Sequence, residues 1–249
     1  MTFLGHVFGW LTSSSNWTGP QGIPLLFWHQ VTLSVAVMAS AVALGGGLGV
    51  ALGHSGRGGL VAVNAANAFR AVPTLALLTL LAIQPAISLR WNGFLAAWIA
   101  LAALAIPPIL TNTYVGMRQV DADVRQAACA MGLTGRQVLV DVELPLAMPL
   151  IMAGIRTASI EVVATSTLAA YVTYTDLGTY VIAGLDSQNS VEAFAGALLV
   201  AALAGLTALL LSVATRVLSP SAMRTQGPGT STGSPGPTLR RQGAVTQPF

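Results

Sequence analysis

The segment from residue 121 to residue 145 carries the side chains best suited to docking another protein. Asp123 is placed to cap the start of a helix, and Thr134, followed three residues later by Gln137, forms a second capping signature. Gly132, which lies between them, suits the left-handed conformation in which many helices end. The pattern predicts a short helix, a tight turn and a second helix.

Two small side chains in the first of these helices, Ala127 and Ala128, would let a groove on a partner protein approach closely. The same pattern also fits a DNA-binding helix-turn-helix or an amphipathic loop lying on a membrane surface. From Arg118 to Glu143 there are three arginines and four acidic residues, whereas DNA binding requires several uncompensated cations. The charge balance therefore argues against nucleic acid as a partner.

A second group of polar residues lies within apolar segments. Asn64, Asn67 and Arg70 follow one another at three-residue spacing, and Glu161 lies in the middle of a later apolar stretch. A charge at the centre of a bilayer costs about 2.5–3.5 kcal/mol, so Glu161 needs a partner. We predict an interhelical Arg70–Glu161 pair and treat Asn67, Arg70 and Glu161 as a candidate translocation path. The alternative is a hydrogen-bonded network next to a kink at Pro73.

Three tyrosines, Tyr171, Tyr174 and Tyr180, lie close together in the sequence. Aromatic rings can form a cage around a quaternary ammonium group. Tyrosines also gather at the membrane–water interface for reasons unrelated to ligands. The sequence leaves both interpretations open.

The residue types argue against an enzyme. All eleven basic residues are arginine, so the chain lacks the lysine of a Walker A loop, and ATP hydrolysis would belong to a partner. Cys129 is the single cysteine, and the three histidines are scattered. We expect no catalytic residues, no metal site and no cofactor, because no nucleophile–base or metal-ligand arrangement is visible.

The elements that carry these residues are membrane helices. The chain has 249 residues, of which 54% are hydrophobic and 8% charged, against roughly 25% charged in soluble domains. Its long uncharged runs are near or above the ~18–20 residues that cross a hydrocarbon core. We therefore predict an all-α integral membrane protein with about five spans, near residues 27–53, 60–83, 94–116, 148–172 and 193–217. Gly45, Gly49 and Gly53 in the first span form a flat groove for another helix.

The arginines predict the orientation. If the loop at 117–147 is cytoplasmic, six arginines near span ends lie inside and only Arg90 lies outside, which places the N-terminus outside and the C-terminus inside. The chain then divides into an exterior lead-in at 1–26, a transmembrane domain at 27–217 and a cytoplasmic tail at 218–249. We expect the tail to be disordered, because it is rich in Pro, Gly, Ser, Thr and Gln.

The loop resembles the EAA loop of bacterial ABC-importer permeases. Gln126-Ala127-Ala128 is followed after three residues by Gly132, then after nine residues by Val142, and after one more by Leu144-Pro145. That spacing matches the family pattern throughout. Gln126 replaces the usual glutamate, which removes a charge, and Val142 replaces isoleucine.

The resemblance extends over residues 16–217 and is strongest with the osmoprotectant branch, the permeases for glycine betaine, carnitine and choline. At the outer loop the branch usually has Gly-Gly-Leu-Gly, where this chain has Thr175-Asp176-Leu177-Gly178. The segments that carry the likeness are residues 16–24, 69–78, 148–158 and 167–171.

The resemblance implies a methionine-importer-like transmembrane fold with a cytoplasmic coupling hairpin. Its partners would be cytoplasmic ABC ATPase subunits, an extracytoplasmic substrate-binding protein and a second permease copy or homologue, assembled among lipids in a bacterial plasma membrane. The substrate would be a small compatible solute: glycine betaine, choline, carnitine or proline betaine. The alternatives are a permease for methionine or another amino acid, and an ATP-independent carrier or channel. The ATPase-coupling residues would be Gln126, Ala127, Ala128, Gly132, Val142, Leu144 and Pro145.

Overall fold

The computed structural model describes residues 2–85, 93–172 and 174–218. Throughout these ranges the secondary structure is helical, with turns between helices and no strand. The predicted all-α architecture is therefore confirmed. Arg90 and the tail from residue 219 onward lie outside the described residues.

Among the described residues, four continuous helical stretches are long and apolar enough to cross a membrane. In the first, α2 (Ile23–Ala41) passes through a π-helical segment (Val42–Gly46) into α3 (Gly47–Ser55). The second is α7 (Phe94–Arg118). The third contains α10 (Leu144–Thr165) and its 3-10 extension (Ser166–Val172), and the fourth is α12 (Ser190–Leu218).

The second predicted span, near residues 60–83, is broken in two. Helices α4 (Gly59–Phe69) and α5 (Thr74–Ala82) meet at 74°, so Pro73 marks a break, a larger change of direction than the predicted kink. Pro73 lies immediately before α5, where its missing N–H removes no helical hydrogen bond. Counted as one span, the pair brings the total to five, as the sequence predicts.

The first and fourth spans begin earlier in the chain than the sequence predicts. The first helix begins at Ile23, ahead of the predicted residue 27, because Pro24 is accommodated in its first turn. The stretch that contains α10 is helical from Gly135 to Val172, so the loop leads into the fourth span without a break.

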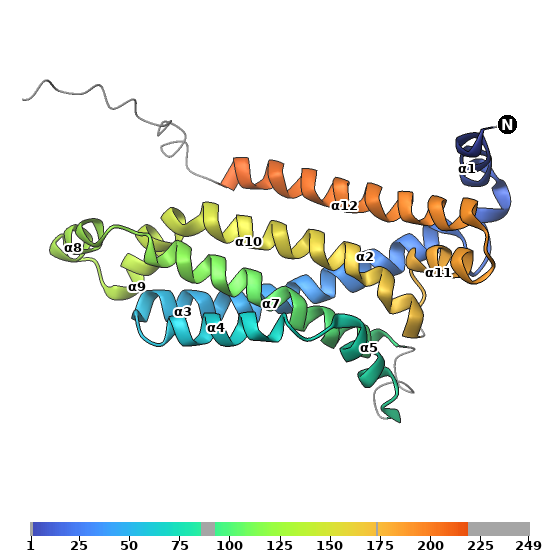
Figure 1. Ribbon diagram of the computed structural model, residues 1–249. Coiled ribbons are helices and arrows are strands. Elements are labelled where there is room, and N and C mark those ends of the chain that lie inside the picture. Colours follow the sequence, from blue (N-terminus) through green and yellow to red (C-terminus); the bar gives the residue numbers. More distant parts are fainter. Residues whose placement is uncertain (1, 86–92, 173, 219–249) are drawn as a thin grey trace, which may run out of the picture. The chain divides into compact units, whose positions relative to one another are not determined.

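Two further helices were not predicted. Helix α1 (Phe3–Thr12) lies in the lead-in and packs on α12, and α11 (Gly178–Asp186) precedes α12 and packs against it. Figure 1 shows α1 and α11 at one end of the long helices and the segment between α7 and α10 at the opposite end.

Helix α7 lies at the centre of the packing and touches α2, α3, α4, α5 and α10. The predicted glycine groove receives it. A Cβ atom on Gly45 would lie 2.9 Å from the Ile106 carbonyl oxygen, and one on Gly53 would lie 2.4 Å from Met117 Cβ. The close approach predicted for these glycines is confirmed, and it fixes the end of α3 against the end of α7. The central core is made of fully buried side chains from α2, α7 and α10, among them Leu33, Val37, Leu101, Ile109 and Val162.

Candidate functional site: the hairpin between α7 and α10

The hairpin begins with α8 (Ala122–Ala130), which three residues separate from the end of α7. Its N-cap is Asp121, whose carboxylate accepts a hydrogen bond from the backbone N–H of Asp123 at 2.9 Å. The prediction that Asp123 caps this helix is therefore wrong by two residues. Both aspartates suit a helix start, since Asp123 within the first turn also faces the positive end of the helix.

The turn after α8 follows the predicted chemistry. Gly132 has φ +87°, and its N–H bonds to the Cys129 carbonyl, while the N–H of Leu133 bonds to the Ala128 carbonyl. These two bonds form a Schellman motif, which needs a residue in the left-handed region. The capping box at the start of α9 (Gly135–Gln137) is also present: Thr134 Oγ1 accepts from the Gln137 N–H, and Gln137 Oε1 accepts from the Thr134 N–H.

The residues matching the EAA pattern do not share one surface. Gln126 and Ala127 are exposed on α8, whereas Ala128 is buried, at 2% exposure. The sequence suggested that Ala128 faces a partner. Its small side chain instead faces inward and lets α8 pack on the rest of the hairpin. Gly132 is exposed, and Val142, Leu144 and Pro145 are half-buried where the hairpin meets α10.

The outer surface of the hairpin also exposes larger apolar side chains. Val124, Met131 and Val140 are 42%, 75% and 50% exposed. Exposed large apolar side chains can mark contact sites for other proteins. The hairpin exposes such side chains together with the polar Gln126.

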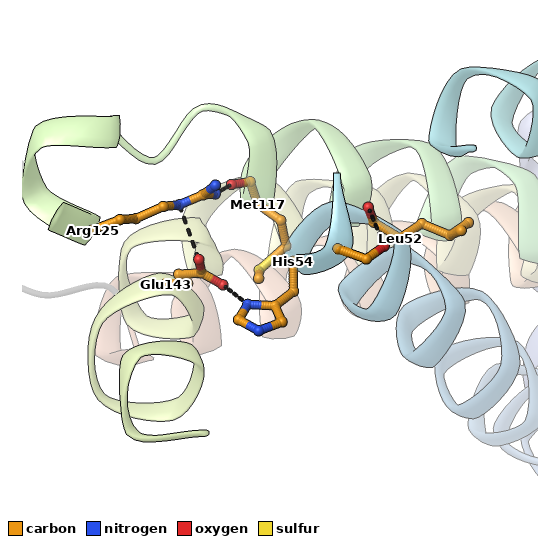
Figure 2. Close-up of polar contacts among 6 residues, drawn as sticks. Leu52, His54, Met117, Arg125 and Glu143 are labelled. Atoms are coloured by element: carbon orange, nitrogen blue, oxygen red, sulfur yellow. Dashed lines mark hydrogen bonds and ion pairs between the residues drawn. The ribbon is translucent and has the colours of Figure 1, made fainter. Parts of the chain in front are cut away.

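A charged cluster beneath the hairpin was missed by the sequence analysis. Glu143 is only 2% exposed, and its two carboxylate oxygens face different partners. His54 Nδ1 lies 2.6 Å from Oε2, and Arg125 Nε lies 2.9 Å from Oε1. Figure 2 shows the three side chains converging, with the Arg125 guanidinium also donating to the Met117 carbonyl. The signal available in the sequence was an acidic residue directly before Leu144, within an apolar stretch.

The predicted pair between the second and fourth spans is present. Arg70 Nη2 donates to Glu161 Oε1 at 2.7 Å, with side-chain exposures of 39% and 30%. Arg70 lies at the break between α4 and α5 and borders a cavity of about 270 Å³. Asn67 and Asn64 are exposed on α4. The contact is confirmed, whereas a role in translocation stays a prediction.

We expect Arg70→Gln and Glu161→Gln each to lower both uptake and thermal stability. Each leaves the opposite charge without its partner in an apolar region, which is unfavourable. Removing both charges together should recover part of the lost stability, because the two residues form one interacting pair. Thermal unfolding in detergent and uptake in vesicles measure this, and two single variants that both match the wild type would refute it.

Two of the three tyrosines singled out in the sequence, Tyr174 and Tyr180, make separate packing contacts. Tyr174 donates to the His29 carbonyl and packs on Phe94, with ring centroids 5.8 Å apart. Tyr180 donates to the Gln21 carbonyl and stacks edge-on against Trp10 at 5.0 Å. These contacts use the rings of Tyr174 and Tyr180 for packing within the protein, and both interpretations of the three tyrosines stay predictions.

The segment between the 3-10 extension of α10 and α11 also holds a buried acid. Asp176 is fully buried between the 3-10 turn and α11. Burial raises the pKa of its carboxyl to about 7, and the hydrogen bond that Oδ1 accepts from the Gly178 N–H opposes this rise. The carboxyl is therefore partly protonated near neutral pH.

Comparison with known proteins decides the family. The model of the binding-protein-dependent transport system inner membrane component family matches residues 41–224. The chain belongs to this family. The predicted function as the transmembrane permease subunit of an ABC importer is thereby confirmed. The family implies ATPase and substrate-binding partners, pairing of permeases, and a multi-pass location in the inner membrane.

Several permeases resemble this chain over most of its length. The choline transport system permease protein OpuBB of Bacillus subtilis is 33% identical over 197 residues, covering 79% of this chain and 88% of the relative. The carnitine transport permease protein OpuCB of Listeria monocytogenes is 32% identical over the same shares. The glycine betaine/proline betaine permease ProW of Escherichia coli is 29% identical, covering 64% of this chain and 44% of ProW.

A solved structure supports the fold. The inward-facing MetNI methionine ABC transporter superposes with a TM-score of 0.67 at 22% identity, covering 78% of this chain and 94% of that chain. At this identity the likeness supports the predicted methionine-importer-like fold and does not bear on the substrate.

Proposed function

We propose that this permease carries a small quaternary-ammonium compatible solute, such as glycine betaine, choline, carnitine or proline betaine, across the plasma membrane. The observation that supports this proposal most strongly is the 32–33% identity to choline and carnitine permeases over about four fifths of the chain. A substrate such as methionine is the main alternative, since the solved relative with this fold transports it.

In this proposal the permease is not itself an enzyme. ATP is hydrolysed by the partner ATPase, which docks on the hairpin between α7 and α10. Gln126 and Ala127 contribute the exposed face of α8, Gly132 permits the turn, and Ala128 holds α8 on the hairpin. Nucleotide-driven movement of α8 then biases the spans between inward and outward openings, a two-state element of the kind that ligands switch. Val142, Leu144 and Pro145 carry that movement into α10.

The domain organisation and orientation complete the proposal. Residues 1–26 form an exterior lead-in, residues 27–217 the permease domain in contact with lipid, and residues 218–249 a cytoplasmic tail. The N-terminus is outside and the C-terminus inside. The positions of α1 and α11 at one end of the long helices and of the hairpin at the other are consistent with this orientation. A second copy or a homologue completes the pore, and nucleic acid is not a partner.

The translocation path would run along the break between α4 and α5. Arg70 and Glu161 pair there next to a cavity of about 270 Å³, and Asn67 is exposed one turn earlier on α4. Polar groups within a membrane domain are costly unless they face protein or water. These positions therefore support an aqueous lining at this place in the assembled importer.

Uptake into vesicles tests the proposed substrate class. The permease is reconstituted with its ATPase and binding protein, and uptake of radiolabelled glycine betaine, choline, carnitine and methionine is compared with and without ATP. We expect ATP-dependent uptake of at least one quaternary-ammonium solute and none of methionine. Uptake of methionine alone would refute the proposed class, and equal uptake without ATP would indicate a carrier or channel.

A further inference from the structure

The buried carboxylate of Glu143 joins three separate parts of the chain. It lies at the last position of the π-helical segment Val138–Glu143, directly before α10. One oxygen faces Arg125 of α8, and the other faces His54 in the last turn of α3. A carboxylate with 2% exposure requires partners on both oxygens, because an unpaired buried charge is strongly unfavourable.

The Arg125 side chain adds a fourth attachment. Its Nε lies at ion-pair distance from Glu143 Oε1, without the alignment of a hydrogen bond, and its Nη2 donates to the Met117 carbonyl in the last turn of α7. The last carbonyls of a helix lack intrahelical donors and attract positive charge. A guanidinium can serve the carbonyl and the carboxylate at once through separate nitrogens, whereas a lysine ammonium presents a single nitrogen.

The attachment to α3 extends the reach of the cluster. Helix α3 contacts α7 through Gly49 and Gly53, so closely that a Cβ at either position would clash with α7 side chains. The His54–Glu143 contact is made one residue beyond this tight contact. The end of α3 therefore reaches the hairpin through this carboxylate, and the end of α7 reaches it through Arg125, which pairs with the same carboxylate (Figure 2).

The π-helical segment sets the direction of Glu143. An α-helix advances about 100° per residue, so one extra residue in a turn rotates everything on one side of it relative to the other. The segment ends at Glu143 and begins at Val138, directly after α9. This extra residue brings the carboxylate between α8 and α3.

We propose that Glu143 is a positioning residue that locks the hairpin to the ends of α3 and α7, so that movement of α8 is transmitted to all three spans that meet there. The inference rests on the proposed role of the hairpin as the ATPase docking site. Arg125 and His54 act through Glu143: Arg125 ties it to α8 and α7, and His54 ties it to α3. None of the three residues needs to touch the ATPase for this function.

The test compares variants in the assembled importer. Arg125→Lys keeps the charge and removes the double attachment, and Arg136→Lys, at an exposed arginine of α9, is its matched control. His54→Leu removes the link to α3, whereas His54→Asn places an amide nitrogen near the position of Nδ1. The first measurement is amide hydrogen exchange in α8. The second is solute taken up per ATP hydrolysed in vesicles.

We expect exchange in α8 to be faster by about tenfold in Arg125→Lys and in His54→Leu, and uptake per ATP to fall by about tenfold, in line with mutations that disturb coupling between sites. The two control variants, Arg136→Lys and His54→Asn, should match the wild type in both exchange and uptake per ATP. The effect of His54→Leu is the sharper expectation, because His54 pairs with Glu143 and Glu143 in turn pairs with Arg125 of α8.

Each other outcome overturns the proposal. Unchanged exchange in both variants would mean that the cluster does not hold α8. Faster exchange with an unchanged uptake-to-ATP ratio, or a failure of both variants to assemble, would assign the cluster a purely structural role. The proposed substrate class fails separately, if the wild-type complex takes up none of the quaternary-ammonium solutes, and the exchange measurement still decides the role of Glu143.

Discussion

Replacing Gly132 with valine is expected to abolish ATP-driven uptake while leaving the amount of permease in the membrane unchanged. Gly132 has φ +87°, a region in which a β-branched residue is a genuine outlier. The strain is of the order of 1–2 kcal/mol for an ordinary residue and larger for valine. No heavy atom lies within 4 Å of the added Cβ, so the effect comes from the backbone conformation and not from a clash.

The consequence of this strain is local. Opening the turn breaks the Schellman bonds to Cys129 and Ala128 and releases α8 from the rest of the hairpin. The spans themselves should insert normally, because the turn is exposed outside them. Gly135→Val is the matched control: it lies three residues away with equally open surroundings and without a positive φ. Uptake by Gly132→Val equal to that of Gly135→Val would contradict the prediction.

Replacing Gly49 with leucine is expected to destabilise the transmembrane core itself. A Cβ at this position would lie 2.7 Å from Thr113 Cβ and 3.0 Å from the Leu110 carbonyl oxygen. Helix α3 would then have to move away from α7. Overpacking of a tight contact costs about 1–3 kcal/mol, and occasionally more, so we expect a lower unfolding temperature in detergent and little assembled importer.

Helix α3 supplies the control for this substitution. Gly47→Leu introduces the same side chain two residues earlier, where no heavy atom lies within 4 Å of an added Cβ. Both substitutions exchange glycine for a better helix former, so any difference in unfolding temperature reports the contact with α7. Equal unfolding temperatures for the two variants would show that the glycine groove does not carry the packing.

The sequence predicted those features that depend on local chemistry. Gly132 and the Thr134 capping box were found because a left-handed turn and a capped helix start each require particular residues within a few positions. The glycine groove was found because four-residue spacing places small residues on one helix face. The Arg70–Glu161 contact was found for a different reason, since a charge within an apolar span needs a partner and few were available.

The remaining features depend on contacts between distant parts of the chain. His54 and Glu143 are separated by 89 positions, and nothing local to either residue indicates the other. Helix α1 is held by pairs such as Trp10 with Tyr180 and Phe3 with Phe194, which tertiary packing alone brings together. The start of α8 was misplaced because Asp121 and Asp123 are both acceptable near a helix N-terminus, and the backbone path after α7 decides between them.

The measurement that tests the central claim most directly is maleimide labelling of Cys129. This is the single cysteine of the chain, and it is exposed on α8. Docking of the ATPase on the hairpin predicts that Cys129 is labelled much more slowly in the purified permease–ATPase complex than in the permease alone. Ser14→Cys in a Cys129→Ser background, at an exposed position of the lead-in, should be labelled equally in both. Equal labelling of Cys129 in an intact complex that hydrolyses ATP would contradict the hairpin as the site at which the ATPase drives the permease.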